Sequence, residues 1–562
     1  MAPSVKKEGG GGRGYFLRGA RRPCRGDTHD SAVHDSSAHD PHDSSAHDPS
    51  AHGQLRRPDV VVVGAGSSGA VLAARLSEDP GRRVLLLEAG PVPRSVSAFA
   101  PALLDAGLVP GARLGHLGVD SYPVHLTPSR PYAVPRGRFL GGSTTVNGGY
   151  FVRARRADFD RWSTVGGDAW SYDRMLPLMR RLENDLDHGA DELHGGTGPL
   201  PVRRTELKHP AAAAFRDAAR ELGFPSEPDK NADSPPGFGP VPCNCADGLR
   251  VNTGISHLLG ALERPNLAVE GASTVLRVVV ERGRATGVIV ERSGRRAFVA
   301  ADEVVLCAGA FSSPHLLHLS GIGPAADLER AGIPVVQDLP AIGAHFSDHP
   351  QIVLEWTPRR PLEAPSRTWL GGALHLSSSG GAYPGDLEIL QSLVPLTALT
   401  DGTPTAPGAP LAFLVSVQSP RSHGRLRTVS ADPTTRPRID YDYLRTPDDR
   451  RALREVIRTT AALLATRAFR RHSPGLLEPS SHVLDDDRAL DRWTAARLGT
   501  AQHTCGTVPM GPAVDPYGRL HGLTGLHVAD TSILPTAPLR GPAATAVLIG
   551  ELVAGAMRDG LG

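Results

Sequence analysis

A short glycine-rich turn near the front of the chain constrains the fold more than any other feature of the sequence. The turn Gly64–Gly69 (GAGSSG) follows the apolar run 59–63 and precedes the apolar run 70–76. The first run predicts a buried parallel strand and the second a helix. Another apolar run, 84–87, ends in Glu88. A strand, a glycine turn, a helix and a second strand ending in an acid together predict a dinucleotide-binding unit.

Each glycine of this turn has a separate expected role. Gly64 permits the tight turn, Gly66 lets the backbone approach a pyrophosphate, and Gly69 lets the helix pack on the strand. The N–H groups that begin the helix are expected to face phosphate, and Glu88 is expected to accept hydrogen bonds from a ribose diol. The cofactor-binding residues predicted from this unit are Gly64, Gly66, Ser67, Ser68, Gly69, Glu88 and Ala89.

Two further glycine-rich stretches decide between nicotinamide and flavin. They are residues 136–147 (RGRFLGGSTTVN) and residues 309–323 (GAFSSPHLLHLSGIG). Both resemble the signatures of the glucose–methanol–choline (GMC) oxidoreductases, which are FAD enzymes. Shorter matches follow in the order of that family, so the resemblance runs from about Asp59 to the C-terminus. These shorter matches are residues 194–200, 264–267, 348–350 and 503–511.

The resemblance implies an α/β chain, with a Rossmann-like FAD-binding domain and an α+β substrate-binding domain built on a mixed sheet. Both domains are expected to be discontinuous. Residues 58–156, 249–347 and 501–562 are assigned to the FAD side, and residues 157–248 and 348–500 to the substrate side. Expected strands are 276–280, 304–306, 387–391 and 411–415, and residues 451–466 read as an amphipathic helix. The further cofactor contacts implied are Arg138, Gly141, Gly142, Ser143, Asn147, Gly148, Val275, Ala308, Gly309 and Asp530.

The segment 502–511 carries the main catalytic candidate, His503. Gly506 follows three residues later, which predicts a loop rather than a helix face. In the family the matching histidine lies beside the flavin and faces the substrate hydroxyl. An imidazole titrates near neutrality and can take a hydroxyl proton as hydride leaves the carbon. Asn147 is the second catalytic candidate. The alternatives are that His503 is a structural loop histidine and that Cys505, interpreted as packing, is a nucleophile.

The chain departs from the family at a second catalytic position. Where the family usually has His or Asn, the alignment falls on Ala543, whose methyl group cannot bind an alkoxide. Another group must assist His503, with Arg540 as a candidate, or the substrate is held differently, or the chemistry has changed. A lyase or photodecarboxylase of the same fold and a non-catalytic flavin protein therefore remain alternatives. Val146 stands where some members attach FAD covalently to histidine, so FAD is expected to bind non-covalently.

The segment 540–545 (RGPAAT) is similar to that of the mycofactocin-associated GMC subgroup. That similarity implies a reduced redox cofactor as donor, in place of a small-molecule alcohol. The electron acceptor is left open between oxygen, a quinone and a respiratory carrier.

Composition bounds the remaining possibilities. A formal net charge of +2 predicts no nucleic-acid partner, and five cysteines predict neither a disulfide framework nor a metal site. No apolar run is long enough for a transmembrane helix, and we expect a cytoplasmic protein. Residues 1–57 contain a tandem repeat of HDSSAHDP but no apolar face, so this tail is expected to be disordered.

Overall fold

The computed structural model of the chain describes residues 57–116, 118–400 and 402–561, so all but Arg57 of the predicted tail lies outside the described residues. The described helices are α1 Gly69–Leu76, α2 Pro101–Leu104, α3 Ser143–Val146, α4 Arg156–Gly166, α5 Tyr172–Leu182, α6 Pro210–Glu221, α7 Gly309–Leu319, α8 Ala325–Arg330, α9 Pro447–Ala465, α10 Arg467–Arg470, α11 Ser481–Asp485, α12 Asp487–Arg497 and α13 Ala543–Arg558. None of them is long and apolar enough to cross a membrane.

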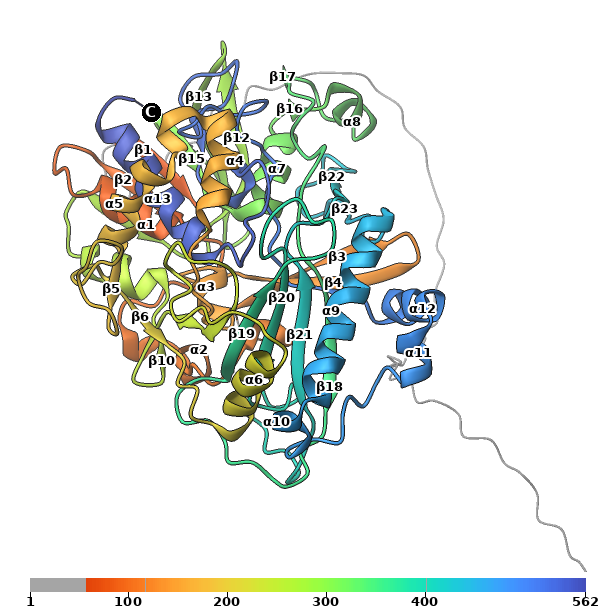
Figure 1. The fold of residues 1–562 in the computed structure, drawn as a ribbon. Coiled ribbons are helices and arrows are strands. Elements are labelled where there is room, and N and C mark those ends of the chain that lie inside the picture. Colours follow the sequence, from red (N-terminus) through yellow and green to blue (C-terminus); the bar gives the residue numbers. More distant parts are fainter. Residues whose placement is uncertain (1–56, 117, 401, 562) are drawn as a thin grey trace, which may run out of the picture. The chain divides into compact units, whose positions relative to one another are not determined.

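A parallel five-stranded sheet forms the nucleotide-binding half (Figure 1). Its strands, in spatial order, are β11 Leu267–Glu270, β2 Val84–Leu87, β1 Val60–Val63, β15 Glu303–Leu306 and β25 Leu526–Val528. Every neighbouring pair is parallel. The four valines of β1 are buried, as expected for a strand covered on both faces. The strands come from three distant parts of the chain, so this half is assembled from segments that are discontinuous in sequence.

Helix α13 joins this half from the C-terminus and packs against α1. The hydroxyl of Ser68 donates to the carbonyl of Ala546 at 2.6 Å. A Cβ on Gly550 would lie 2.6 Å from the carbonyl oxygen of Ser68, so only glycine permits this approach. A separate antiparallel sheet lies beyond α7 and comprises β12 Thr274–Glu281, β13 Arg284–Arg292 and β14 Arg295–Ala300.

A second large sheet, antiparallel, forms the other half. Its strands, in spatial order, are β24 Gly499–Thr500, β18 Pro350–Trp356, β21 Leu411–Val417, β20 Leu387–Ser392, β19 Leu370–Leu376 and β7 Phe238–Pro240. Helices α6 and α9 cover one face of it (Figure 1). Apolar side chains of that face and of the helices form a core separate from the core of the nucleotide-binding half. Together the two sheets confirm the predicted α/β class with a second, sheet-based part.

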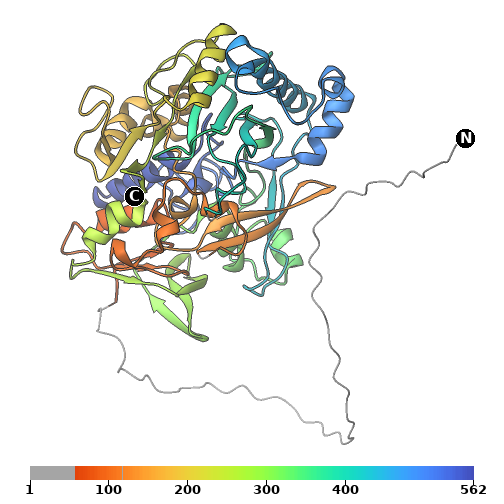
Figure 2. The same ribbon diagram turned by 90° about the horizontal axis from the view of Figure 1, so that it is seen from below.

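The remaining strands are short or lie at the edges. A four-stranded sheet holds β22 Arg425–Arg427, β23 Arg438–Asp440, β3 Val119–Thr127 and β4 Arg130–Gly137. In Figure 2 the hairpin of β3 and β4, drawn in orange, extends toward α12, and Arg130 donates to the carbonyl of Leu498 just beyond that helix. The others are β5 Glu183–Asp185, β6 Leu200–Arg204, β8 Pro242–Cys243, β9 Cys245–Ala246, β10 Leu249–Arg250, β16 Ile322–Gly323 and β17 Gln337–Asp338.

The expected helix at 451–466 begins earlier than the apolar periodicity indicates. Helix α9 starts at Pro447, and the Thr446 side chain caps it by accepting the N–H of Asp449 at 3.2 Å. Proline in the first turn and an N-cap threonine are ordinary start signals. The apolar periodicity does not reveal this start, because the first turn of the helix consists of proline and charged residues.

Candidate active site

The two predicted glycine turns meet at the carboxyl end of β1. The N–H of Gly141 donates to the carbonyl of Ala65 at 2.8 Å. A Cβ on Gly142 would lie 2.7 Å from the Cα of Gly66, so the two backbones touch. A Cβ on Gly66 itself would stay 3.9 Å from the nearest protein atoms. The requirement for glycine at position 66 therefore does not come from the protein around it, which fits a close approach by a bound group.

The backbone around Gly66 also offers hydrogen-bond donors. Among the described residues, no acceptor binds the N–H groups of Gly66, Ser67 and Ser68. They stand at the N-terminal end of α1, where orphan donors and the helix dipole favour phosphate. This geometry fits the pyrophosphate of a dinucleotide. The side chain of Ser68, in contrast, is bound to α13.

Glu88 lies at the end of β2, as the sequence predicts. Its carboxylate accepts the N–H groups of Ala65 and Gly90, each at 2.8 Å. Burial raises the pKa of Glu88, and these two bonds and the charge of Arg138 oppose the rise. Each oxygen keeps a further lone pair. A ribose diol could therefore be bound without breaking either bond. Ala89 beside it is half-buried.

The remaining predicted cofactor residues fall into three places. Arg138 lies close to Glu88, and its guanidinium donates to Thr274 at 3.5 Å, next to Val275. Ser143 begins the short helix α3 and Asn147 follows it, with the Asn147 side chain accepting the N–H of Gly149 at 3.0 Å. The carbonyl of Gly148 accepts the indole N–H of Trp369 at 2.9 Å.

Asp530 lies just after β25 and is buried, beside the half-buried Ala308 and Gly309. One carboxylate oxygen accepts the N–H of Gly309 at 2.8 Å and the hydroxyl of Ser313 at 2.5 Å. The other accepts the N–H and hydroxyl of Ser532. Asp530 therefore fixes the turn after β15 at the same edge of the sheet as the glycine turns.

The structure places His503 in a loop and pairs it with a second histidine, His349. The two Nδ1 atoms lie 2.9 Å apart and the rings are nearly perpendicular. Asp348 positions both residues, because one of its oxygens accepts the N–H of His349 at 2.7 Å and that of His503 at 2.8 Å. Its other oxygen accepts the hydroxyl of Thr504 at 2.6 Å. The segment 348–350 matches the family in sequence but has no predicted role in catalysis.

The pairing has a consequence for the tautomer of His503. Burial lowers the pKa of His503 and of His349, so both rings are neutral at pH 7. Nε2 of His349 is buried without a hydrogen-bond partner among the described residues, and the backbone of Pro538 opposes the lowering of the pKa of this ring. Each neutral ring carries one proton, so one of the two Nδ1 atoms donates and the other accepts; where Nδ1 of His503 donates, its Nε2 is unprotonated and can accept a proton. Among the described residues, that nitrogen has no hydrogen-bond partner.

Tyr150 and Gly541 also lie close to His503. A Cβ on Gly541 would lie 3.1 Å from the Tyr150 ring and 3.3 Å from Cε1 of His503. The Tyr150 hydroxyl donates to Glu388 at 2.7 Å, and burial raises the pKa of Tyr150 well above its usual value. Tyr150 is in none of the motifs quoted from the sequence, and Glu388 lies in the expected strand 387–391 without a predicted role in the site. They come from distant segments, and no local pattern marks them.

Arg540, the candidate to compensate for Ala543, lies in a buried group of charged residues. The Arg540 guanidinium is buried and binds Glu227 and the carbonyls of Lys230 and Arg153. Its two terminal nitrogens bind that cluster and its Nε has no partner among the described residues, so assistance to His503 by Arg540 stays a prediction. Cys505 is fully buried and burial raises the pKa of its thiol well above the usual value, as a packing residue requires.

Comparison with known proteins gives the family. The profiles of the N-terminal and C-terminal regions of the GMC oxidoreductases match residues 58–351 and 420–550. The chain belongs to the GMC oxidoreductase family. It is 41% identical to an uncharacterised GMC-type oxidoreductase of Rhodococcus erythropolis, over 88% of this chain and 97% of that protein. It is 33% identical to an oxygen-dependent choline dehydrogenase of Photobacterium profundum, over 89% and 92%.

Solved structures agree with this assignment. Pyridoxine 4-oxidase from Mesorbium loti superposes with a TM-score of 0.82 and 29% identity, over 89% of this chain and 99% of that one. FAD is the cofactor of GMC oxidoreductases, and the residues around Gly66 fit its pyrophosphate. This GMC oxidoreductase is therefore a flavoprotein.

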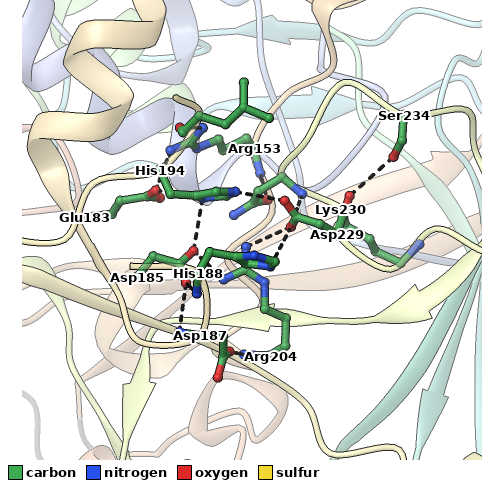
Figure 3. A network of polar contacts seen from close by, with 12 residues as sticks. Arg153, Glu183, Asp185, Asp187, His188, His194, Arg204, Asp229, Lys230 and Ser234 are labelled. Carbon is green, nitrogen blue, oxygen red and sulfur yellow. Dashed lines mark hydrogen bonds and ion pairs between the residues drawn. The ribbon is translucent and has the colours of Figure 1, made fainter. Parts of the chain in front are cut away.

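A buried cluster of acids and a histidine elsewhere in this GMC oxidoreductase has the composition of a metal site (Figure 3). His194 lies 3.1 Å from Glu183 and Asp185 and 2.8 Å from Asp229. Arg153 binds Glu183, and Arg204 binds both aspartates. The carboxylates raise the pKa of His194 to about 10, against the effect of burial. Three carboxylates face three cations, so the charges balance without a metal ion.

Proposed function

We propose that the protein oxidises the CH–OH group of an alcohol donor. The observation that carries the proposal is the pairing of His503 with His349, whose Nδ1 atoms lie 2.9 Å apart and leave Nε2 of His503 without a hydrogen-bond partner among the described residues. Bound FAD would supply the hydride acceptor. His503 would take the hydroxyl proton, because its lowered pKa keeps the ring neutral at pH 7.

The relatives support the same reaction class. One is named a choline dehydrogenase and a structural neighbour a pyridoxine 4-oxidase. We also propose that FAD binds through the predicted contacts around Gly66 and Glu88, that the domain boundaries are those expected from the sequence, and that the protein is cytoplasmic. The mycofactocin-associated role remains a prediction that depends on residues 540–545 alone, and the acceptor is open between oxygen, a quinone and a respiratory carrier.

Anaerobic flavin reduction tests the proposal. The purified yellow protein is mixed with a panel of primary and secondary alcohols, and the flavin absorbance near 450 nm is followed. Bleaching by at least one alcohol, with formation of the matching carbonyl product, is the expected result. A flavin that stays oxidised with every alcohol, while dithionite reduces it, would favour the lyase or non-catalytic alternative.

A further inference from the structure

A row of polar side chains crosses the antiparallel sheet of the substrate side. His375 on β19 pairs with Glu388 on β20, Glu388 pairs with Ser416 on β21, and Ser416 pairs with Gln351 on β18. Paired residues on neighbouring strands share one face of a sheet. The alternate residues of these strands belong to the core beneath α6 and α9. The polar row therefore occupies the face away from those helices.

This row adjoins the histidine pair. Gln351 follows His349 by two residues on the same segment. Glu388 accepts the hydroxyl of Tyr150, whose ring adjoins His503 across Gly541. Glu388 is close enough to both histidines for its charge to favour their protonation. The carboxylate thus stands one side chain away from the proposed reaction centre.

Two acceptors at this end of the row lack good donors. Oε2 of Glu388 binds both Tyr150 and, at 3.0 Å, Nε2 of His375. Oε1 of Glu388 has only a long contact of 3.5 Å, from Nε2 of Gln418. Oε1 of Gln418 has no partner among the described residues, although this side chain is 1% exposed. Buried acceptors are normally satisfied, so this arrangement lacks a hydrogen-bond donor.

The charges around Glu388 indicate which kind of hydrogen-bond donor fits beside it. Behind His375, Lys230 contacts the other imidazole nitrogen at 3.0 Å. Lys230, Arg155 and Arg540 surround the single carboxylate of Glu227. Burial keeps His375 neutral by lowering its pKa. The buried group therefore holds three cations against two carboxylates, Glu388 included. An added cation would increase this excess, whereas a hydroxyl would not.

We propose that Glu388 and Gln418 form a specificity site that binds a second, unreacting hydroxyl of a neutral donor, so the preferred substrates are polyhydroxylated alcohols. This inference depends on the proposed alcohol oxidation at His503. It concerns the part of the donor that does not react, and not the contacts of His503 or of the flavin.

Donors of matched length test the proposal. Anaerobic flavin reduction by the holoenzyme is measured with α,ω-diols from 1,3-propanediol to 1,6-hexanediol, and with the mono-alcohols and amino alcohols of equal length. At one or more chain lengths, the second-order rate constant for flavin reduction should be about tenfold higher, or more, for the diol than for the mono-alcohol. This is the gain expected from one hydrogen bond to a charged group. In Glu388→Gln and in Gln418→Met the ratio of diol to mono-alcohol should fall toward one.

Glu355→Gln is the matched control, since Glu355 is exposed on β18 of the same sheet and should keep the ratio. Flavin content and thermal stability of each variant show that it is folded, and Gln418→Met carries the test where Glu388→Gln does not fold. Equal rates for diols and mono-alcohols, or a preference for amino alcohols, would overturn the specificity site but leave alcohol oxidation standing. Failure of every alcohol to reduce the flavin would overturn both.

Discussion

At the scale of single residues, the sequence indicates His503 as a catalytic candidate but cannot reveal the residue that pairs with it. Residues His349 and His503 are 154 positions apart, and the contact at 2.9 Å exists only because two loops meet. The segment 348–350 was visible as a motif, but nothing in its spacing connects it with 503. Tyr150 and Glu388 were missed for the same reason.

Replacing His503 with alanine should slow flavin reduction by about 10²–10⁴-fold, the usual contribution of a general base. FAD should stay bound, because the glycine turns that fit its pyrophosphate do not contain His503. Rapid-mixing measurements of the reductive half-reaction check this. His521→Ala is a matched control in an exposed loop. An unchanged reduction rate in His503→Ala would contradict the role of His503 and favour the non-redox alternative.

The pH dependence of flavin reduction follows from the environment of His503. Burial lowers the pKa of this imidazole from its usual 6.5, so the base is unprotonated at pH 7. The limiting rate of reduction should therefore be flat above pH 7 and fall only on the acid side, with its inflection below 6.5. A profile that rises steeply between pH 7 and 9 would show that another group sets the protonation state.

At the scale of elements, the strand, glycine turn and helix at residues 59–76 are the part of the fold that the sequence predicts best. The expected strands, turn and helix at 59–76 occur as β1 and α1, since a buried valine run and a glycine turn specify local structure strongly. The contact of this turn with Gly142 could not be deduced from either segment alone. It requires the second turn to cross the end of β1.

That contact separates two effects of adding a side chain. Gly66→Ala should reduce FAD affinity by about tenfold or more while the apoprotein keeps its stability, because the new Cβ meets protein atoms only at 3.9 Å. Flavin content and urea unfolding of the apoprotein check the two parts. Gly555→Ala, where a Cβ would meet nothing within 4 Å on α13, should retain FAD. Normal flavin content in Gly66→Ala would contradict the pyrophosphate assignment.

At the scale of the whole molecule, FAD should be released intact when the protein unfolds. Position 146, at the end of α3, holds a valine whose side chain is buried in the core and has no nucleophile for a flavin bond. Acid precipitation of the yellow holoenzyme should therefore leave the flavin in the supernatant. Flavin retained in the pellet would show a covalent link elsewhere in the chain.

The last prediction concerns the stability of the whole fold against pH. His194 has a folded pKa of about 10, against a usual 6.5, so its proton stabilises the folded state. This contribution is complete below pH 6.5 and is lost progressively as the pH rises to 10. Asp185 and Asp229 have lowered pKa values, so their contributions are lost only in acid, as the pH falls below 3.8.

Thermal unfolding from pH 6 to 10 should therefore show a falling Tm in the wild type. In His194→Gln the Tm should be lower at pH 6 and should fall less over this range, because glutamine does not titrate. Burial lowers the pKa of Lys230 to about 8, which acts in the opposite direction at alkaline pH in both proteins. The difference between wild type and variant removes that effect, and a difference in Tm that stays constant from pH 6 to 10 would contradict a protonated His194.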